Sequence, residues 1–494
     1  MLLAAQKKQI EYGDFQTPPE LAQKVCQKLV EHGVNPDIII EPTCGIGAFV
    51  EASAYSFPNA KKIIGIEINP DYLKEVKEKL SQLPNSNHIE LINGDFFKFH
   101  WKESLSIPQG TILIIGNFPW VTNSRQGVIG GANLPVKSNF QNHSGFEAMT
   151  GRSNFDISEW MLIKTAEQLQ NRDAYLAMLC KTSVARKFLN HLHLNNIGIS
   201  NAALFRIDAK KHFNASVDAC LLLCKFDRSA NSQDYFVYDS LESESYRQVG
   251  HRRGITISDL ETFERLSYLF GYRDTKWRSG IKHDCSEVME LQKIDNKFVN
   301  GLDETIDIED IFLYPLLKGS DIANNRVTDT NRFLLVTQKV AGEPTHLIRH
   351  LAPKTWKYLE KHSSYLDKRK SRIYKASPRF SIFGVGSYTF MPWKIAICGL
   401  YKNLDFRLIG KLDEKPVVFD DTGYFLSFKS KEEAEDVHDL LMSPNAQDFL
   451  SSLIFWDEKR PIKTSILNCL NLDMLRNKKT FRLFEKKTKN YRVK

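Results

Sequence analysis

A glycine turn and two acidic residues at the ends of predicted strands could together bind a nucleoside. The turn contains Gly45 and Gly47 and follows an apolar run. Glu67 ends the next apolar run, 22 residues after Gly45, where a carboxylate can accept both hydroxyls of a ribose. Asp95 ends a third run and precedes Phe96, so a carboxylate there can accept from an adenine amino group while a ring packs on the base. This spacing predicts an adenosine pocket.

The same turn lacks the features of two other nucleotide sites. Val50 stands where a dinucleotide-binding turn has its third glycine, and no Gly-Lys-Ser/Thr sequence of a triphosphate-binding loop is present. Two glycines in such a turn can also serve packing alone. The acids at two successive strand ends favour a nucleoside site without a pyrophosphate.

A fourth predicted strand, residues 111–116, is followed directly by Asn117-Phe118-Pro119-Trp120. By itself this group can be a capped turn. In sequence order with the glycine turn and Asp95, however, it resembles the S-adenosylmethionine-dependent amino-methyltransferases, whose fourth-strand motif reads Asn/Asp-Pro-Pro followed by Tyr, Phe or Trp.

The order of the motifs is that of the gamma class of adenine-N6 DNA methyltransferases of restriction-modification systems. Residues 12–18, which include Thr17 and Pro18, look like the N-terminal cofactor motif of that class. The resemblance covers residues 11–226, and residues 371–394 and 455–462 look like the C-terminal part of restriction-associated members.

The resemblance implies S-adenosyl-L-methionine as the cofactor and no metal ion. It implies that Asn117, Phe118, Pro119 and Trp120 are catalytic. The implied cofactor-binding residues come from the N-terminal motif, the glycine turn and the strand ends: Thr17, Glu41, Pro42, Gly45, Gly47, Glu67, Ile68, Asp95, Phe96 and Asn117.

The catalytic motif suits methylation of an exocyclic amine, a poor nucleophile because its lone pair is delocalised into the ring. Two acceptors, the Asn117 side-chain oxygen and the Phe118 carbonyl, can take its two N–H bonds and stabilise the charge that develops. Pro119 stiffens the turn, and Trp120 offers a flat surface to a base taken out of the duplex. Phe118 replaces the usual first proline, so we expect a less rigid loop and a modest loss of activity.

Two further residues have alternative interpretations. Thr17 matches the position that binds the cofactor's carboxylate, and Thr17-Pro-Pro-Glu20 is also a helix start with a capping-box glutamate. Phe213 lies in a segment that resembles the one whose aromatic residue packs on the flipped base, but an ordinary core phenylalanine fits equally well.

The elements that must position these residues alternate short apolar runs with amphipathic segments, as in a parallel sheet covered by helices. We predict an α/β fold: a seven-strand Rossmann-like catalytic domain at residues 1–228 and an α+β target-recognition domain at 229–494, with a boundary between 228 and 255. Residues 121–154 form a long segment of low periodicity that we expect to close over substrate or contact DNA.

The charge is concentrated in the second half. Of the 494 residues, 67 are Lys or Arg and 59 are Asp or Glu, a net charge of +8. Residues 1–228 hold 24 basic and 22 acidic residues, whereas 351–380 hold nine and two. We expect residues 354–375 to form an amphipathic helix with one basic face. The substrate contacts predicted from the resemblance and this charge pattern are Trp120, Phe213, Lys368, Arg369, Arg372, Arg379 and Trp393.

We therefore predict a site-specific adenine-N6 DNA methyltransferase that acts on double-stranded DNA after base flipping, with a separately encoded restriction endonuclease as a second partner. The alternatives are an RNA or protein-glutamine methyltransferase and a catalytically silent DNA-recognition subunit. A monomer suffices, and the oligomeric state stays open.

No run of apolar residues is long enough to span a membrane, and the N-terminus has no secretory signal. The eight cysteines show no metal-ligand spacing and are expected in the reduced core of a cytoplasmic, DNA-associated prokaryotic protein.

Overall fold

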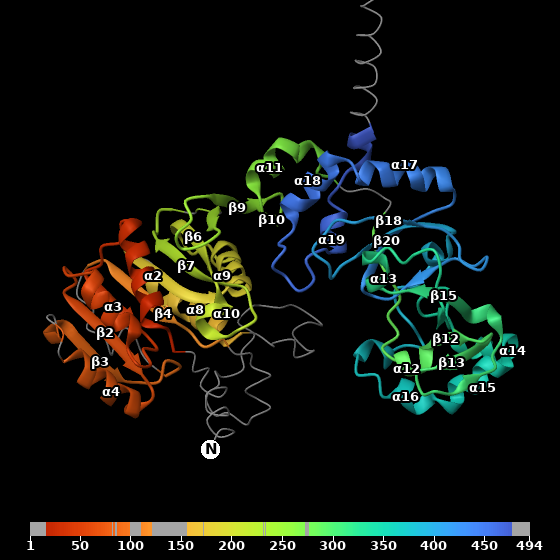
Figure 1. Cartoon of the computed structure of the whole chain (residues 1–494), viewed down its shortest axis with the longest axis horizontal. Helices are drawn as coiled ribbons and strands as arrows, with labels where there is room; N and C mark the ends of the chain where they lie inside the picture. Colours follow the sequence, from red (N-terminus) through yellow and green to blue (C-terminus); the bar gives the residue numbers. More distant parts are fainter. Residues whose placement is uncertain are drawn as a thin grey trace, which may run out of the picture. The chain divides into compact units, whose positions relative to one another are not determined.

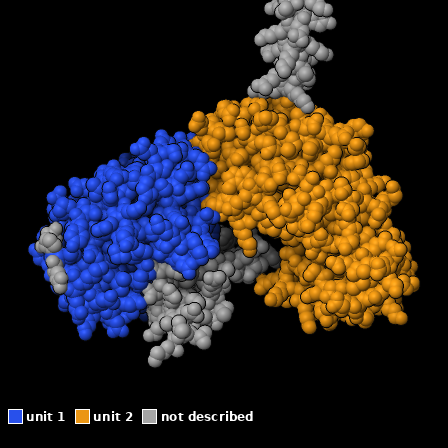
Figure 2. Space-filling view, viewed as in Figure 1, with its two compact units in different colours: residues 1–256 blue, residues 257–494 orange. Residues whose placement is uncertain are grey.

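The computed structural model describes residues 16–476 apart from 82, 84–85, 99–109, 121–155, 171, 231, 233 and 272–275. The chain forms two compact units, residues 1–256 and 257–494, coloured separately in Figure 2. The division predicted at Arg228 lies inside the first unit. The polar segment after Arg228 continues the first unit's sheet, because strands β8, β9 and β10 fall there.

The first unit is built on a ten-stranded sheet in the order β10-β9-β8-β6-β7-β5-β4-β1-β2-β3 (Figure 1). Its strands are β1 (Ile38–Glu41), β2 (Lys62–Glu67), β3 (Ile89–Asn93), β4 (Ile112–Asn117), β5 (Ala174–Lys181), β6 (Ile199–Ile207), β7 (Ala219–Phe226), β8 (Tyr235–Tyr238), β9 (Tyr246–Arg252) and β10 (Ile255–Ile257). The first seven of these confirm the predicted Rossmann-like sheet.

The sheet is mixed rather than parallel throughout. Strands β1 to β5 pair in parallel, but β7 runs antiparallel between β5 and β6. The link from Ile207 to Ala219 contains only the short helix α10 (Ala209–Phe213). So short a link favours an antiparallel return, because a parallel pair needs a crossover of a dozen residues or more.

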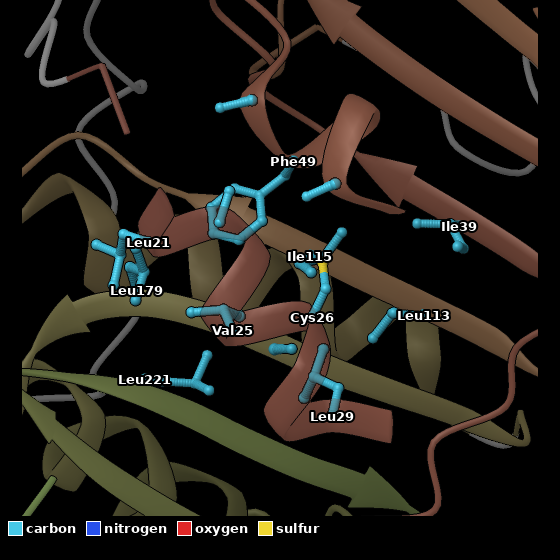
Figure 3. Close-up of a cluster of buried hydrophobic side chains, with 14 of the residues drawn as sticks. Leu21, Val25, Cys26, Leu29, Ile39, Phe49, Leu113, Ile115, Leu179 and Leu221 are labelled. Atoms are coloured by element: carbon cyan, nitrogen blue, oxygen red, sulfur yellow. The ribbon is translucent and has the colours of Figure 1, made fainter. Parts of the chain in front are cut away.

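Helices cover both faces of this sheet. They are α2 (Pro19–Glu31), α3 (Ala48–Ser56), α4 (Pro70–Leu80), α8 (Ile157–Leu169) and α9 (Thr182–Leu194). Leu21, Val25 and Leu29 project from α2 toward Leu113 and Leu221 of the strands (Figure 3), in a core to which α3 and α4 also contribute. Successive strand residues point to opposite faces of the sheet. The strand residues that alternate with Leu113 and Leu221 therefore point to the other face, which α8 and α9 cover.

Helix starts in this unit follow from their capping residues. Asn69 accepts from the backbone N–H of Asp71 at the start of α4, where Pro70 occupies the first turn. Asp156 accepts from the N–H of Ser158 at the start of α8. These caps fix where the chain re-enters a helix after the strand ends that carry the predicted site.

The second unit contains two smaller sheets. The four-stranded sheet has the order β11-β20-β17-β18 and the six-stranded sheet the order β14-β13-β12-β16-β15-β19. Their strands are β11 (Arg278–Ser279), β12 (Glu290–Ile294), β13 (Lys297–Asn300), β14 (Thr305–Ile306), β15 (Leu313–Leu317), β16 (Arg332–Leu335), β17 (Trp393–Cys398), β18 (Arg407–Ile409), β19 (Val418–Phe419) and β20 (Gly423–Phe428). The helices are α11 (Leu260–Leu266), α12 (Ser286–Met289), α13 (Gly319–Ala323), α14 (Ile348–Leu351), α15 (Pro353–Lys361), α16 (Ser363–Asp367), α17 (Lys431–Leu441), α18 (Pro444–Leu453) and α19 (Thr464–Leu467).

The single basic helix predicted over residues 354–375 is wrong. Helix α15 ends at Lys361, and α16 ends at Asp367. Arg369 turns inward, and its Nε donates to the Leu366 carbonyl at 2.8 Å, which satisfies the helix end and directs the chain away from the axis. The basic run from Lys368 onward is therefore not part of an α-helix, and its regular structure is limited to a 3-10 turn at Arg372–Tyr374.

In the described part of the chain, no helix has the length and the apolar run that crossing a membrane requires. Within the same residues no cluster of three or more His, Cys, Asp or Glu side chains is placed to hold a metal ion. All eight cysteines are buried and free.

Candidate active site

A cavity of about 360 Å³ opens at the carboxyl ends of β1, β2, β3 and β4. The end of a parallel sheet is where α/β folds bind their ligands. The predicted cofactor residues that line it are Thr17, Glu41, Pro42, Gly45, Glu67, Ile68, Asp95, Phe96 and Asn117. Gly47, also predicted, does not line it. The structure thus gathers in one cavity residues that are up to 100 positions apart in the sequence.

The glycine turn is held by side chains from two other segments. Gly45 has a φ of +50°, and its N–H donates to Glu67 Oε2 at 2.9 Å. The next N–H, of Ile46, donates to Gln16 Oε1 at 3.1 Å. A Cβ on Gly45 would come within 2.5 Å of that oxygen, so only glycine fits. Gly47, with φ +77°, serves packing, since a Cβ there would meet Val76 of α4.

Glu67 is fixed at the end of β2 by two backbone donors. Besides Gly45, the N–H of Asn69 donates to its Oε1 at 2.8 Å. Each carboxylate oxygen can accept more than one hydrogen bond. The carboxylate is therefore preorganised on the cavity wall and retains acceptor capacity for a pair of hydroxyls.

Glu41 lies deeper in the cavity wall and is buried. Its Oε2 accepts from the N–H of Val50 at 3.0 Å. Burial raises the pKa of Glu41 well above its ordinary value, and the nearby Glu67 raises it further. A cationic group bound in the cavity would favour the ionised carboxylate.

Asp95 and Phe96 form the wall at the end of β3. Asp95 Oδ1 accepts from the N–H of Phe97 at 2.9 Å. The Phe96 ring lies 5.4 Å from that of Phe118 and 6.4 Å from that of Trp160, both edge to face. A carboxylate beside an aromatic wall suits a purine with an exocyclic amine.

Asn117 ends β4 and lines the cavity beside the N-terminal motif. Its Nδ2 donates to Thr17 Oγ1 at 3.3 Å. Thr17 does not cap the helix that follows, because the N-cap of α2 is Pro18 and no side chain caps it. The capping-box interpretation of Thr17 is therefore wrong, and its buried hydroxyl contacts Asn117 of the predicted catalytic motif.

The rest of the motif differs in exposure. Pro119 lines the cavity, whereas Phe118 is buried behind it. Trp120 is also buried, with its Nε1 3.4 Å from the carbonyl oxygen of Leu179. Its ring meets that of Phe213 edge to face at 5.0 Å. The two residues predicted to contact a base thus lie together, and a base stacked between them requires one ring to turn away.

Sequence reasoning missed three contributors to this site. Gln16 orders the glycine turn, as described above. Thr43 lines the cavity, and its buried hydroxyl has no hydrogen-bond partner among the described residues. Lys181 donates to the Trp120 carbonyl at 2.9 Å and pairs with Asp156 at 2.5 Å. Gln16 lies inside the N-terminal motif at residues 12–18, and Thr43 follows Pro42, so their positions in the sequence could have indicated them. Nothing in the sequence around Lys181 indicates a place in the site.

The predicted DNA contacts of the second unit divide into three kinds. Lys368 and Arg372 are exposed. Arg369 is buried, so its predicted phosphate contact is wrong. Arg379 is exposed and pairs with Asp367. Trp393 is half-buried, packed beside Gly410 with Lys431 over its ring. The predicted loop at residues 121–154, with its Arg and Asn side chains, lies outside the described residues.

Comparison with known proteins gives one relative of nearly the same length. The chain is 58% identical over 478 residues to the type II methyltransferase M.NspV from Nostoc sp., which covers 96% of this chain and 99% of that protein. It is 31% identical over 118 residues to the type II methyltransferase M.CvrRI from Paramecium bursaria Chlorella virus XZ-6E, covering 24% of this chain and 27% of that one. No family model matches the chain.

Among solved structures, the type IIL restriction-modification enzyme MmeI, determined in complex with DNA, superposes with a TM-score of 0.51 at 14% identity. The match covers 94% of this chain and 64% of MmeI, so the chain spans less than two thirds of that enzyme. At this identity the match supports the fold alone, and it extends through both units.

Proposed function

The chain belongs to the type II methyltransferases, and we propose that it methylates the N6 amino group of adenine at a specific site in duplex DNA. S-adenosylmethionine is the methyl donor. The observation that carries the choice of an amino group is Asn117 at the end of β4, on the wall of the cavity, followed by Pro119. A side-chain oxygen and a backbone carbonyl in that order suit an exocyclic amine.

The cavity fits the donor by its chemistry. The Glu67 carboxylate supplies acceptors for ribose hydroxyls, and Asp95 beside Phe96 supplies an acceptor and an apolar wall for adenine. The carboxyl groups of Glu41 and Glu67 both line the cavity. A bound sulfonium would favour the ionised form of the buried Glu41, whose pKa is raised by burial. The buried Thr43 hydroxyl on the wall leaves a hydrogen bond for a ligand.

The bound donor supplies an electrophilic methyl group, and the residues of the chain hold the acceptor amine in line with it. The Asn117 oxygen and the Phe118 carbonyl accept from the amine and stabilise the positive charge that develops on nitrogen. Lys181 holds the Trp120 carbonyl and so fixes the end of the motif. The proton leaves after the nitrogen becomes cationic, so no strong base is needed before attack.

Modification-sensitive sequencing of DNA from cells that express the protein tests this function. It gives the modified base, its position and the surrounding sequence together. We expect N6-methyladenine at one recurrent sequence, absent when Asn117 is replaced. Methylation of cytosine would contradict the choice of base. Unmodified DNA would contradict DNA as the substrate and favour the alternatives that act on RNA or on a protein glutamine.

We infer that a separately encoded restriction endonuclease of the same specificity accompanies this protein, because modification protects host DNA from such an enzyme. The alternative to an active methyltransferase is a catalytically silent recognition subunit, which the replacement of the usual proline by Phe118 favours. Calorimetric titration with S-adenosylmethionine separates an active methyltransferase from a silent subunit, since a silent subunit needs no cofactor.

Glu67→Ala should weaken binding of S-adenosylmethionine about tenfold or more, because it removes an acceptor to the ribose and the anchor of the Gly45 N–H. Glu67→Gln, which keeps one acceptor oxygen, should lose less. Calorimetry measures both, with Glu75→Ala on the exposed face of α4 as the control. An unchanged cofactor affinity in Glu67→Ala would remove this residue from the ribose site.

Replacing Lys368, Lys370 and Arg372 together by glutamine should weaken DNA binding and reduce its salt dependence. All three are exposed, and no carboxylate pairs with them in the described part of the chain. Each lost phosphate contact should lower the slope of log affinity against log salt by about 0.9. The matched control neutralises the exposed Lys293, Lys297 and Lys402 of the same unit. A wild-type slope in the first variant would show that this segment does not touch phosphates.

A further inference from the structure

A tight turn in the second unit presents one arginine at its corner. The N–H of Ser381 donates to the carbonyl of Pro378 at 3.1 Å, which closes a four-residue turn with Arg379 and Phe380 in its centre. Phe380 has a φ of +65°, a value that turns of this kind normally give to glycine. A bulky residue in that conformation is strained, and such strain often marks functional sites.

Burial of the Phe380 ring offsets that strain. The side chain is fully buried and belongs to the core that β12, β15 and β16 also build. Its ring packs edge to face on Trp356 of α15 at 5.4 Å. The ring thus anchors the turn to the core, while the neighbouring Arg379 stays exposed.

Buried polar side chains also fix the backbone of the turn. The hydroxyl of Thr345 donates to the Arg379 carbonyl, and that of Thr337 to the Phe380 carbonyl at 2.7 Å. Gln338 Oε1 accepts from the N–H of Ile382 at 2.9 Å. All three side chains are buried. These three hydrogen bonds hold the backbone of the turn in one conformation, which fixes the position from which the Arg379 side chain leaves the surface.

Arg369 joins this turn to the end of α16. Its guanidinium donates to the Leu366 carbonyl at 2.8 Å and to the Ser381 carbonyl at 2.7 Å. It also lies 3.7 Å from the ring centre of Tyr374. Because Leu366 precedes Asp367 and Ser381 follows the corner of the turn, the buried guanidinium sets the spacing between Asp367 and Arg379.

At the surface, Arg379 and Asp367 form an exposed pair. Nη2 lies 2.8 Å from Oδ2, and each side chain is 52% exposed. An exposed ion pair contributes little to stability, so the pair itself is not needed to hold the fold together. The pair presents donors and an acceptor side by side, with no net charge.

We propose that Arg379 and Asp367 read one G·C base pair of the DNA target. In the major groove, guanine offers two acceptors, N7 and O6, and the paired cytosine offers an amino donor. The guanidinium can donate to guanine while the carboxylate accepts from cytosine. A phosphate contact fits less well, because the Asp367 carboxylate would repel the DNA backbone. The inference rests on duplex DNA as the substrate proposed above.

Selection of bound duplexes from a random pool tests this reading with the full chain in the absence of the methyl donor. Arg379→Ala should lose its preference at one G·C position by about 10- to 100-fold and keep the others. Arg379→Lys should lose less, and Asp367→Asn should weaken the preference at the same position. Both residues are exposed, so the melting temperature should not change.

The matched control is Arg265→Ala, which breaks another exposed pair of the same unit, with Asp448 at 3.5 Å. Its selected sequences should equal those of the wild type. The inference is overturned if Arg379→Ala selects the wild-type sequence, or if its binding falls equally for all sequences with a reduced salt slope, as for a phosphate contact. Selection measures binding alone, so neither result bears on whether adenine is the methylated base. Conversely, methylation of another base would not contradict recognition of a G·C pair by Arg379.

Discussion

Replacement of Asn117 by alanine is expected to lower the rate of methyl transfer about 100- to 1,000-fold, as for the loss of one preorganised group that stabilises charge in the transition state. The physical reason is that its oxygen acts mainly on charge that develops on the target nitrogen during transfer. Cofactor binding and DNA binding should both remain measurable. Single-turnover kinetics with saturating donor and DNA isolates the chemical step.

Two further variants separate this role from a structural one. Asn117→Asp keeps acceptor oxygens at the same place and should retain more activity than alanine. Thr17→Val removes the hydroxyl that accepts from Asn117 Nδ2, so it should cost less than the loss of Asn117 itself. A single-turnover rate within threefold of the wild type in Asn117→Ala would rule out the proposed mechanism.

The catalytic fold could be predicted from the sequence because its signals are local. Buried parallel strands read as short, wholly apolar runs, and the functional residues follow them directly. Helix periodicity is equally local, as in α4, where Val76 and Leu80 are buried on one face of the helix. The cavity then gathers Glu67, Asp95 and Asn117, because the carboxyl ends of neighbouring parallel strands meet at one edge.

Contacts between side chains distant in sequence could not be predicted in this way. Nothing in the sequence indicates that the rings of Trp120 and Phe213 face each other, or that Lys181 donates to the carbonyl of Trp120. The positions of these residues follow from the pairing of β5 with β4 and β7, which only the fold determines.

The second unit was harder to predict because charge pattern does not reveal burial. Arg369 stands in a run of exposed cations, yet it is the one whose guanidinium finds three carbonyl acceptors and an aromatic ring. A charged side chain can be buried when its donors find hydrogen-bond acceptors in this way. Lys394, the neighbour of the predicted DNA contact Trp393, is buried as well.

Lys394 is expected to make the stability of the protein depend on pH above neutrality. It lies on β17, only 1% exposed, and its Nζ donates to the Met391 carbonyl at 2.8 Å. No carboxylate pairs with it in the described residues, and burial lowers the pKa of Lys394 to about 7. The unfolded chain, with a lysine pKa of about 10.4, then binds more protons than the folded protein between these values. Stability should therefore rise with pH from about 7 to about 10.

Lys394→Met should remove this dependence and stabilise the protein at neutral pH. Methionine has a similar shape and no charge to bury, and a pKa lowered this far corresponds to a cost of up to about 5 kcal/mol at pH 7. Above the unfolded pKa that cost vanishes, and the variant should be less stable by about 1 kcal/mol for the lost hydrogen bond to Met391. Urea unfolding of both proteins at pH 7 and pH 11 measures the difference in stability between them at each pH. The change in that difference isolates Lys394, because every other group titrates in both proteins. Lys402→Met, at an exposed position of the same unit, is the control. A variant that is destabilised equally at both pH values would mean that Lys394 is buried without a shifted pKa.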